Sequence, residues 1–171
     1  GLGDVYKRQV LEFKLFKYSC DYYIRNGVMM YKDGLKKLED CHAILLGSVG
    51  MPSVADHISL WGLLIPIRRA FDQYVNLRPV KSLKGIDSVL RDEKNIDYLI
   101  VRENSEGEYS DIGGIENKNQ ADEFVFQTAI FSKKGTERIV NYAYELAAKR
   151  KNKLASATKS NGIIHSMTYW D

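Results

Sequence analysis

The feature that most restricts the fold is an alternation of short apolar runs with segments of helical periodicity. The apolar runs have the length of strands, and the run at 123–130 is also rich in β-branched and aromatic residues. We therefore expect strands at 43–47, 98–101, 123–130 and 154–158, and helices at 33–40, 56–75 and 135–150. This order is typical of an α/β fold with a mostly parallel sheet and flanking helices.

Local signals refine the second of these helices. Asp56 is a candidate N-cap, because a carboxylate there can accept a hydrogen bond from the first turn. Pro66 lies inside the helical pattern, so we expect a kink or two helical pieces. Pro79 disfavours a helical conformation at Arg78, which should be extended.

Composition excludes several classes of protein. The 171 residues suffice for one domain or for part of a larger one. A net charge of +3, from 25 basic and 22 acidic residues, is too small and too mixed for a nucleic-acid or membrane surface. No apolar run is long enough to cross a bilayer. Cys20 and Cys41 form no disulfide framework, so we expect reduced thiols and a cytoplasmic location.

The segment 99–109 begins as a buried strand and then turns polar at Arg102. Arg68 on the preceding helix and Arg78 after its end are further candidates, since guanidinium groups bind carboxylates in bidentate pairs. Taken singly, each arginine is more often solvated or ion-paired, and spacing alone does not select among them. Tyr109 and Lys159 could equally be packing and surface residues.

Four segments together resemble the isocitrate/isopropylmalate dehydrogenase family, whose members are β-decarboxylating dehydrogenases. The segments are LLGSVGMP at 45–52, IRRAFDQYVNLRPVK at 67–81, IVRENSEGEY at 100–109 and SATKSNGI at 156–163. Within the family, CDYYIRNGVMM and KSNGIIHSMTYWD look most similar to the tartrate/D-malate dehydrogenase branch. The resemblance runs in order over residues 10–171 and implies an isopropylmalate dehydrogenase-like fold.

The resemblance implies NAD-dependent oxidative decarboxylation of a small 2-hydroxy acid, with Mg²⁺ or Mn²⁺. Its implied substrate-binding residues are Arg68, Arg78, Arg102 and Leu64, and its implied catalytic residues are Tyr109 and Lys159. Tyr109 would return a proton to carbon. Lys159 would assist removal of the hydroxyl proton in the partner subunit's site, which implies a homodimer. A lysine near several cations can have a lowered pKa, which suits a base. Asn161 would lie near the nicotinamide.

The same resemblance implies an incomplete protein. Residues 1–9 look like an unrelated leader, 10–78 like part of the cofactor-side domain, and 79–171 like a truncated dimerisation and substrate domain. In relatives the metal-binding aspartates follow the segment that ends at Asp171. We therefore expect this polypeptide alone to bind neither metal nor NAD well and to have no turnover.

Three questions stay open at this level. The runner-up activity is that of 3-isopropylmalate dehydrogenase, although Trp61 and the WGLL context favour a smaller substituent, D-malate or tartrate. A non-catalytic, dimerising module is the alternative outside the enzymes. The acids Glu103, Glu106 and Glu108 either orient the arginines or face solvent.

Overall fold

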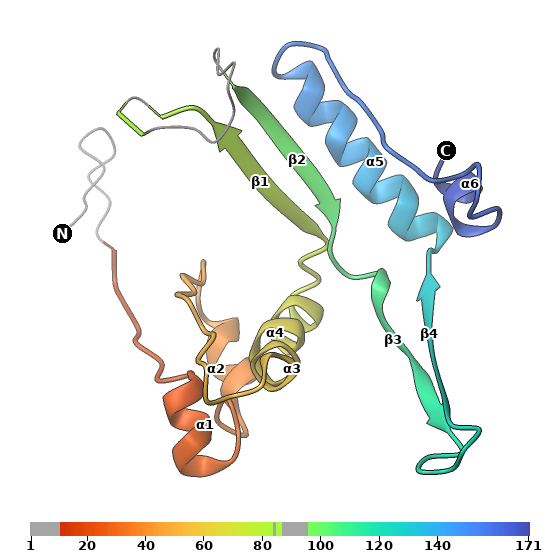
Figure 1. Cartoon of the computed structure of the whole chain (residues 1–171). Helices are drawn as coiled ribbons and strands as arrows, with labels where there is room; N and C mark the ends of the chain where they lie inside the picture. Colours follow the sequence, from red (N-terminus) through yellow and green to blue (C-terminus); the bar gives the residue numbers. More distant parts are fainter. Residues whose placement is uncertain (1–10, 84, 87–95) are drawn as a thin grey trace. The chain divides into compact units, whose positions relative to one another are not determined.

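The computed structural model describes residues 11–83, 85, 86 and 96–171, which belong to two compact units, Gly1–Ala70 and Phe71–Asp171 (Figure 1). Each unit mixes helical or strand elements with long irregular segments, and each is described on its own. The predicted leader at 1–9 lies outside the described residues. The predicted domain boundary after Arg78 stays a prediction.

The first unit begins with two short helices, α1 (Cys20–Asn26) and α2 (Gly34–Glu39). Ser19 caps α1, since its hydroxyl oxygen accepts from the Tyr22 N–H at 3.2 Å. Gly27 ends the helix in the left-handed conformation, with φ of 73°. The helix predicted at 33–40 is confirmed as α2.

The second predicted helix is divided into three pieces: α3 (Asp56–Ser59), the π-helical turn η1 (Leu60–Leu64) and α4 (Ile65–Ala70). The Ile65 N–H donates to the Leu60 carbonyl, and this wider turn immediately precedes Pro66, which has no N–H to donate. The predicted interruption is thereby confirmed, but the predicted end at 75 is wrong, because the helix ends at Ala70 and a strand begins at Val75. The predicted cap is wrong: Ala55 is the N-cap, and Asp56 lies in the first turn, where the helix dipole favours a carboxylate.

The core of the first unit lies where these helices meet, and its buried members are Cys20, Met29, Leu38, Val54, Leu63, Ile65 and Ile67. Gly62 is required by this packing, because a Cβ there would lie 2.6 Å from Met29 Cγ. The strand predicted at 43–47 is not found, and Leu45 is 94% exposed. A strand needs a hydrogen-bonded neighbour, and no described segment pairs with this one.

Among its described residues, the second unit contains two two-stranded sheets, both antiparallel. In one, β1 (Val75–Lys81) pairs with β2 (Asp97–Glu103); in the other, β3 (Gly107–Glu116) pairs with β4 (Phe124–Ile130). The expected mostly parallel sheet is therefore not met among the described strands. One reason is that the connection at 117–123 is too short for the crossover that parallel strands need.

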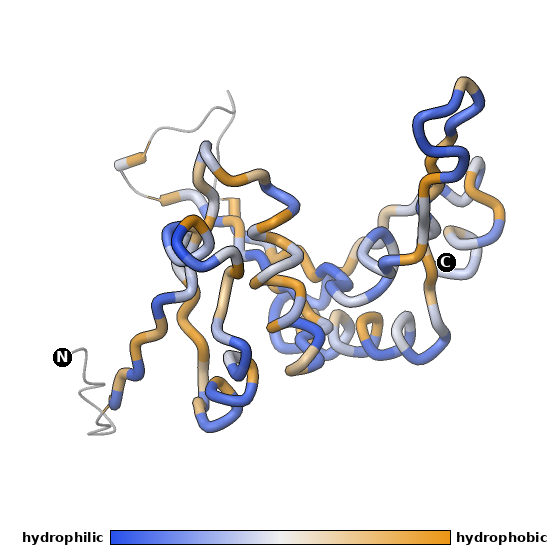
Figure 2. The backbone as a smooth tube through the Cα atoms, turned by 90° about the horizontal axis from the view of Figure 1, so that it is seen from below, coloured by the Kyte–Doolittle hydropathy of each residue, from blue (hydrophilic) through white to orange (hydrophobic). Residues whose placement is uncertain are grey.

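The long helix α5 (Lys133–Ala148) packs against β2 and confirms the helix predicted at 135–150. Apolar residues, orange in Figure 2, recur along it between hydrophilic ones, and Ile139 is buried. The short helix α6 (Ser166–Trp170) follows. The strand predicted at 154–158 is an irregular segment without a pairing partner among the described residues, so that prediction is wrong.

Candidate functional site

Two of the three predicted arginines lie on the same face of the β1–β2 sheet. Arg78 of β1 is opposite Ile100, and Arg102 of β2 is opposite Asn76. Side chains alternate between faces along a strand, so these four positions share one face and the arginines are diagonal neighbours. The Arg78 Nε donates to Asn76 Oδ1 at 2.9 Å. Two guanidinium groups on adjacent strands make this face suitable for a dianion.

Arg102 is held at the end of β2 by the residue two positions further on. Its Nη2 donates to Asn104 Oδ1 at 3.1 Å, and Asn104 is only 7% exposed. The Arg102 Nε is buried and has no hydrogen-bond partner among the described residues. An unpaired buried donor costs about 1–3 kcal/mol of folding free energy. The Nε–H group of Arg102 can therefore donate one further hydrogen bond.

Tyr109 lies beside Arg102. The Arg102 guanidinium carbon is 5.4 Å from the centroid of the Tyr109 ring. Gly107 lies between them in the chain, and its φ of 72° is readily adopted by glycine. The structure thus brings together Arg78, Arg102 and Tyr109 from β1, β2 and β3.

The three acids of this segment have three different environments, which resolves the open alternative. Glu103 accepts hydrogen bonds at Oε1 from the N–H groups of Asn104, Ser105 and Glu106, at 3.0, 2.7 and 3.2 Å. Glu106 accepts from the N–H and the hydroxyl of Ser132, the N-cap of α5. Glu108 is exposed. Glu103 and Glu106 therefore fix the turn between β2 and β3 through hydrogen bonds to backbone N–H groups and to Ser105 and Ser132.

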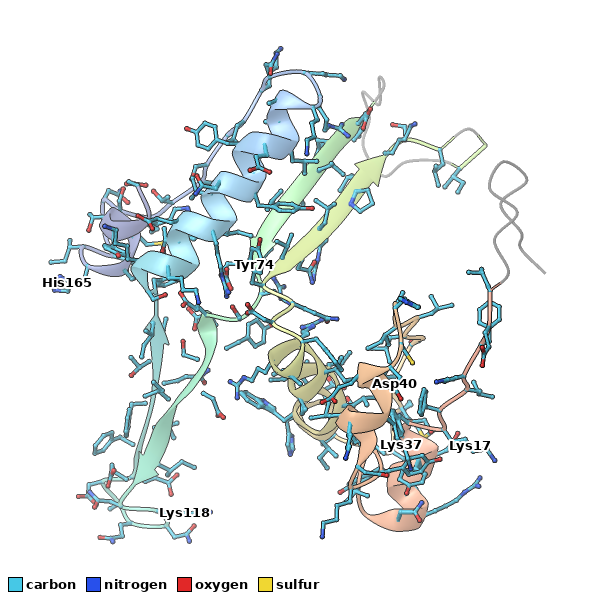
Figure 3. The ribbon with its side chains drawn as sticks, turned by 180° about the vertical axis from the view of Figure 1, so that it is seen from behind. Lys17, Lys37, Asp40, Tyr74, Lys118 and His165 are labelled. Atoms are coloured by element: carbon cyan, nitrogen blue, oxygen red, sulfur yellow. The ribbon has the colours of Figure 1, made fainter. Side chains whose placement is uncertain are left out.

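Arg138 of α5 is a residue that sequence reasoning missed. It donates from Nη1 to both carboxylate oxygens of Asp72, at 2.9 and 3.1 Å, and from Nη2 to Ser105 Oγ at 2.6 Å. Its guanidinium carbon lies 4.4 Å from the ring centroid of Tyr74, which Figure 3 labels at the start of β1. The one available signal was its place next to the buried Ile139. Arg138 joins α5 to the two segments that carry the arginines.

Lys159 and Asn161 lie in the exposed turn before α6. The Lys159 carbonyl accepts from the N–H groups of Gly162 and Ile163, at 3.0 and 2.9 Å. Hydrogen bonds from Ser160 and then Thr158 hold the pKa of the Asp171 carboxyl below its usual value. Within the described chain, no contact joins this turn to Arg102.

Arg68 and Leu64 belong to the first unit, on α4 and η1, and both are half-buried. Their position relative to the arginines of the second unit stays a prediction. Neighbouring Arg69 lies over the Trp61 ring, 5.2 Å from guanidinium carbon to centroid.

The described residues do not fit a metal centre. No three His, Cys, Asp or Glu side chains within 11–83, 85, 86 and 96–171 gather closely enough to hold an ion. In the same ranges, no helix has the length and apolar character to traverse a bilayer.

Helices combined with two antiparallel ribbons, one of which carries Arg78 and Arg102 on one face, define an α/β protein. The sequence model of the family described as "Isocitrate/isopropylmalate dehydrogenase" matches residues 2–171, and the chain belongs to that family. Relatives include the tartrate dehydrogenase/decarboxylase of Pseudomonas putida, 51% identical over 94% of this chain and 46% of its own length. The D-malate dehydrogenase (decarboxylating) of Escherichia coli is 50% identical over 90% of this chain and 44% of its own.

Solved structures agree on the fold. The isocitrate dehydrogenase from Methylococcus capsulatus superposes with a TM-score of 0.75 over 89% of this chain and 43% of its own, at 22% identity. The chain thus spans under half the length of the relatives that it matches.

Proposed function

We propose that this chain supplies the substrate-carboxylate-binding part of an NAD-dependent dehydrogenase that oxidatively decarboxylates a small 2-hydroxy acid, D-malate or tartrate. The observation that carries the proposal is the shared face of Arg78 and Arg102, with Tyr109 beside Arg102. The names of the Pseudomonas putida and Escherichia coli relatives supply the reaction and the substrates.

Each predicted residue has one part in this proposal. Arg68, Arg78 and Arg102 bind the substrate carboxylates, since guanidinium stays charged throughout and pairs with carboxylate in a bidentate geometry. Tyr109 returns a proton to the carbon that loses CO₂. Lys159 assists removal of the hydroxyl proton, and Asn161 lies near the nicotinamide.

NAD would accept the hydride, and Mg²⁺ or Mn²⁺ would polarise the new carbonyl. Because the described residues form no metal site, we assign no step of the reaction to them through a metal.

Leu64 is the residue of this chain that we propose for substrate choice. It is half-buried and carries no polar atom to receive a third carboxylate. An apolar pocket distinguishes substrates by only about 1–3 kcal/mol per methylene, so several small 2-hydroxy acids should be accepted. Isopropylmalate remains the runner-up substrate.

We further propose a homodimer with a shared active site. The β3–β4 hairpin exposes apolar side chains on both faces: Ile112, Phe124 and Phe126 on one, and Ile115 and Val125 on the other. Exposed apolar surface of this kind marks protein interfaces.

A graft tests the function. Residues 10–171 would replace the matching part of the Pseudomonas putida tartrate dehydrogenase/decarboxylase, and NADH formation would be measured with D-malate, tartrate and 3-isopropylmalate in the presence of Mn²⁺. We expect turnover of D-malate or tartrate, and a loss of kcat/KM of about a hundredfold or more in Arg78→Met and Arg102→Met. Arg25→Met, at an exposed position of α1, is the matched control.

A second graft that exchanges only residues 75–109 guards against misfolding of the larger one. Faster turnover of 3-isopropylmalate would favour the runner-up. Folded grafts that dimerise and turn over no substrate would favour the non-catalytic dimerising module.

A further inference from the structure

Two asparagines stand in the same relation to the two arginines of the β1–β2 face. Asn76 Oδ1 accepts from Arg78 Nε at 2.9 Å, and Asn104 Oδ1 accepts from Arg102 Nη2 at 3.1 Å. Asn76 precedes Arg78 by two residues in β1, which puts this pair on one side of the strand, and Asn104 follows Arg102 by two residues, just past the end of β2. Asn76 is also the cross-strand partner of Arg102. The same device therefore occurs twice on one surface.

Asn104 is fixed by further hydrogen bonds to the segment before β1. Its Nδ2 donates to the Gln73 carbonyl at 3.0 Å, and its backbone N–H donates to the Tyr74 carbonyl at 2.9 Å. The amide nitrogen must face a carbonyl, so the amide oxygen must face Arg102. Since Asn104 is 7% exposed, this orientation is set by the fold.

The chemistry of the amide explains why asparagine suits these positions. A carboxylate there would bind guanidinium more strongly, but it would cancel the charge that a substrate carboxylate needs. An amide oxygen directs the guanidinium and leaves its charge intact. We propose that Asn76 and Asn104 are positioning residues that direct Arg78 and Arg102 toward the substrate carboxylates without neutralising them. The proposal rests on the proposed function for the identity of the anion.

The first experiment needs no ligand. In the 171-residue chain labelled with ¹⁵N-arginine, the Nε–Hε signal of Arg78 and the Nη–Hη signal of Arg102, which are the donors to the two asparagines, are assigned from Arg78→Lys and Arg102→Lys. We expect Asn76→Ala to move the Arg78 signal, and Asn104→Ala the Arg102 signal, to the position of free arginine. Asn152→Ala, in the exposed turn after α5, should move neither. Unchanged signals in both asparagine variants would overturn the positioning.

The second experiment separates charge from structure by titrating the chain with D-malate. Asn76→Asp strengthens the hydrogen bond to Arg78, so the variant should unfold at the same or a higher urea concentration. We nevertheless expect its dissociation constant for D-malate to rise roughly tenfold, because the added charge opposes the ligand. Asn152→Asp, which adds the same charge at a remote turn, should change it less than about twofold.

A merely structural role predicts tighter or equal D-malate binding by Asn76→Asp, and that result would overturn the proposal. Asn104→Asp tests the same effect of added charge on D-malate binding at the second asparagine. Because this variant also loses the hydrogen bond to the Gln73 carbonyl, Asn104→Ala, which loses that bond without adding charge, is measured beside it. Absence of D-malate binding in every variant, the parent chain included, counts against the proposed function, and the ligand-free signals then decide the positioning alone.

Discussion

The guanidinium carbon of Arg138 lies 4.4 Å from the ring centroid of Tyr74. A side chain of α5 thus packs on the residue that immediately precedes β1. The same side chain reaches Asp72 and Ser105, with 21% of it exposed. One arginine thus connects the segment before β1, the turn after β2 and the helix that packs on them.

Replacing Arg138 should be costly for stability. Arg138→Met keeps the apolar stem and removes the ion pair with Asp72, the bond to Ser105 and the contact with Tyr74. We expect a loss of roughly 2 kcal/mol in the free energy of unfolding, after discounting for the 70% exposure of Asp72.

Urea unfolding followed by circular dichroism measures this loss, and Arg150→Met is the control. Arg150 also joins the α5 region to β2, through an ion pair with Asp97, but it is more exposed, at 31%. Its loss should cost under about 1 kcal/mol. Equal losses of unfolding free energy in Arg138→Met and Arg150→Met would contradict the larger contribution of Arg138 to stability.

The Asp97–Arg150 pair predicts a dependence of stability on pH. The Nη2 of Arg150 donates to Asp97 Oδ1 at 2.8 Å, and this hydrogen bond, with the charge of Arg150, lowers the pKa of the Asp97 carboxyl. A carboxyl with a lowered folded pKa stabilises the fold above its unfolded pKa of about 3.9. The contribution is lost as the pH falls through the lower, folded pKa.

Asp97→Asn should therefore unfold at lower urea concentration than the parent chain at pH 7, and the difference should shrink steadily as the pH falls below 4. In an Arg150→Met background the same substitution should show little pH dependence, because the main cause of the shift is absent. A difference that grows toward low pH would refute the sign of this argument.

Gly135 predicts an unusual response to alanine. Gly to Ala within a helix normally stabilises it by up to about 1 kcal/mol. Here the new methyl group would collide with the carboxylate of Glu106, which accepts hydrogen bonds at the start of α5. The carboxylate can move aside only by giving up its hydrogen bonds to Ser132, so we expect Gly135→Ala to lower the free energy of unfolding by about 1 kcal/mol.

A double-mutant cycle identifies the cause of that loss. In a Glu106→Ala background, Gly135→Ala should be neutral or stabilising, because the colliding group is gone. An undiminished loss in that background would show that the collision is not responsible.

The local sequence pattern predicted helices and strands correctly where the residues of the element alone determine its conformation. The helix at 135–150 and the strand at 98–101 were predicted because periodicity and β-forming residues agree there. The strands at 43–47 and 154–158 failed because pairing needs a neighbour that the pattern does not contain. Strand β3 was missed because polar and glycine residues interrupt its alternation.

The site divides in the same way. Motifs predicted Arg78, Arg102 and Tyr109 as site residues, but the shared face of Arg78 and Arg102 depends on the register Asn76↔Arg102. Arg138 is 66 residues from Asp72 in the chain, and the sequence of neither segment predicts their contact. Positioning residues of this kind follow from pairing across the fold and are not visible in local sequence.

The β3–β4 hairpin yields the last prediction, which concerns assembly. Val125 is 68% exposed and is opposite Ile115 on one face of the hairpin. If two copies of the chain associate through this surface, Val125→Lys places a charge in the apolar contact and should raise the dimer dissociation constant about tenfold or more. Sedimentation equilibrium measures it, and Lys118→Glu, at the hydrophilic tip labelled in Figure 3, is the control. A dimer that tolerates Val125→Lys unchanged would place the interface elsewhere, because a lysine at its centre could not remain desolvated without cost.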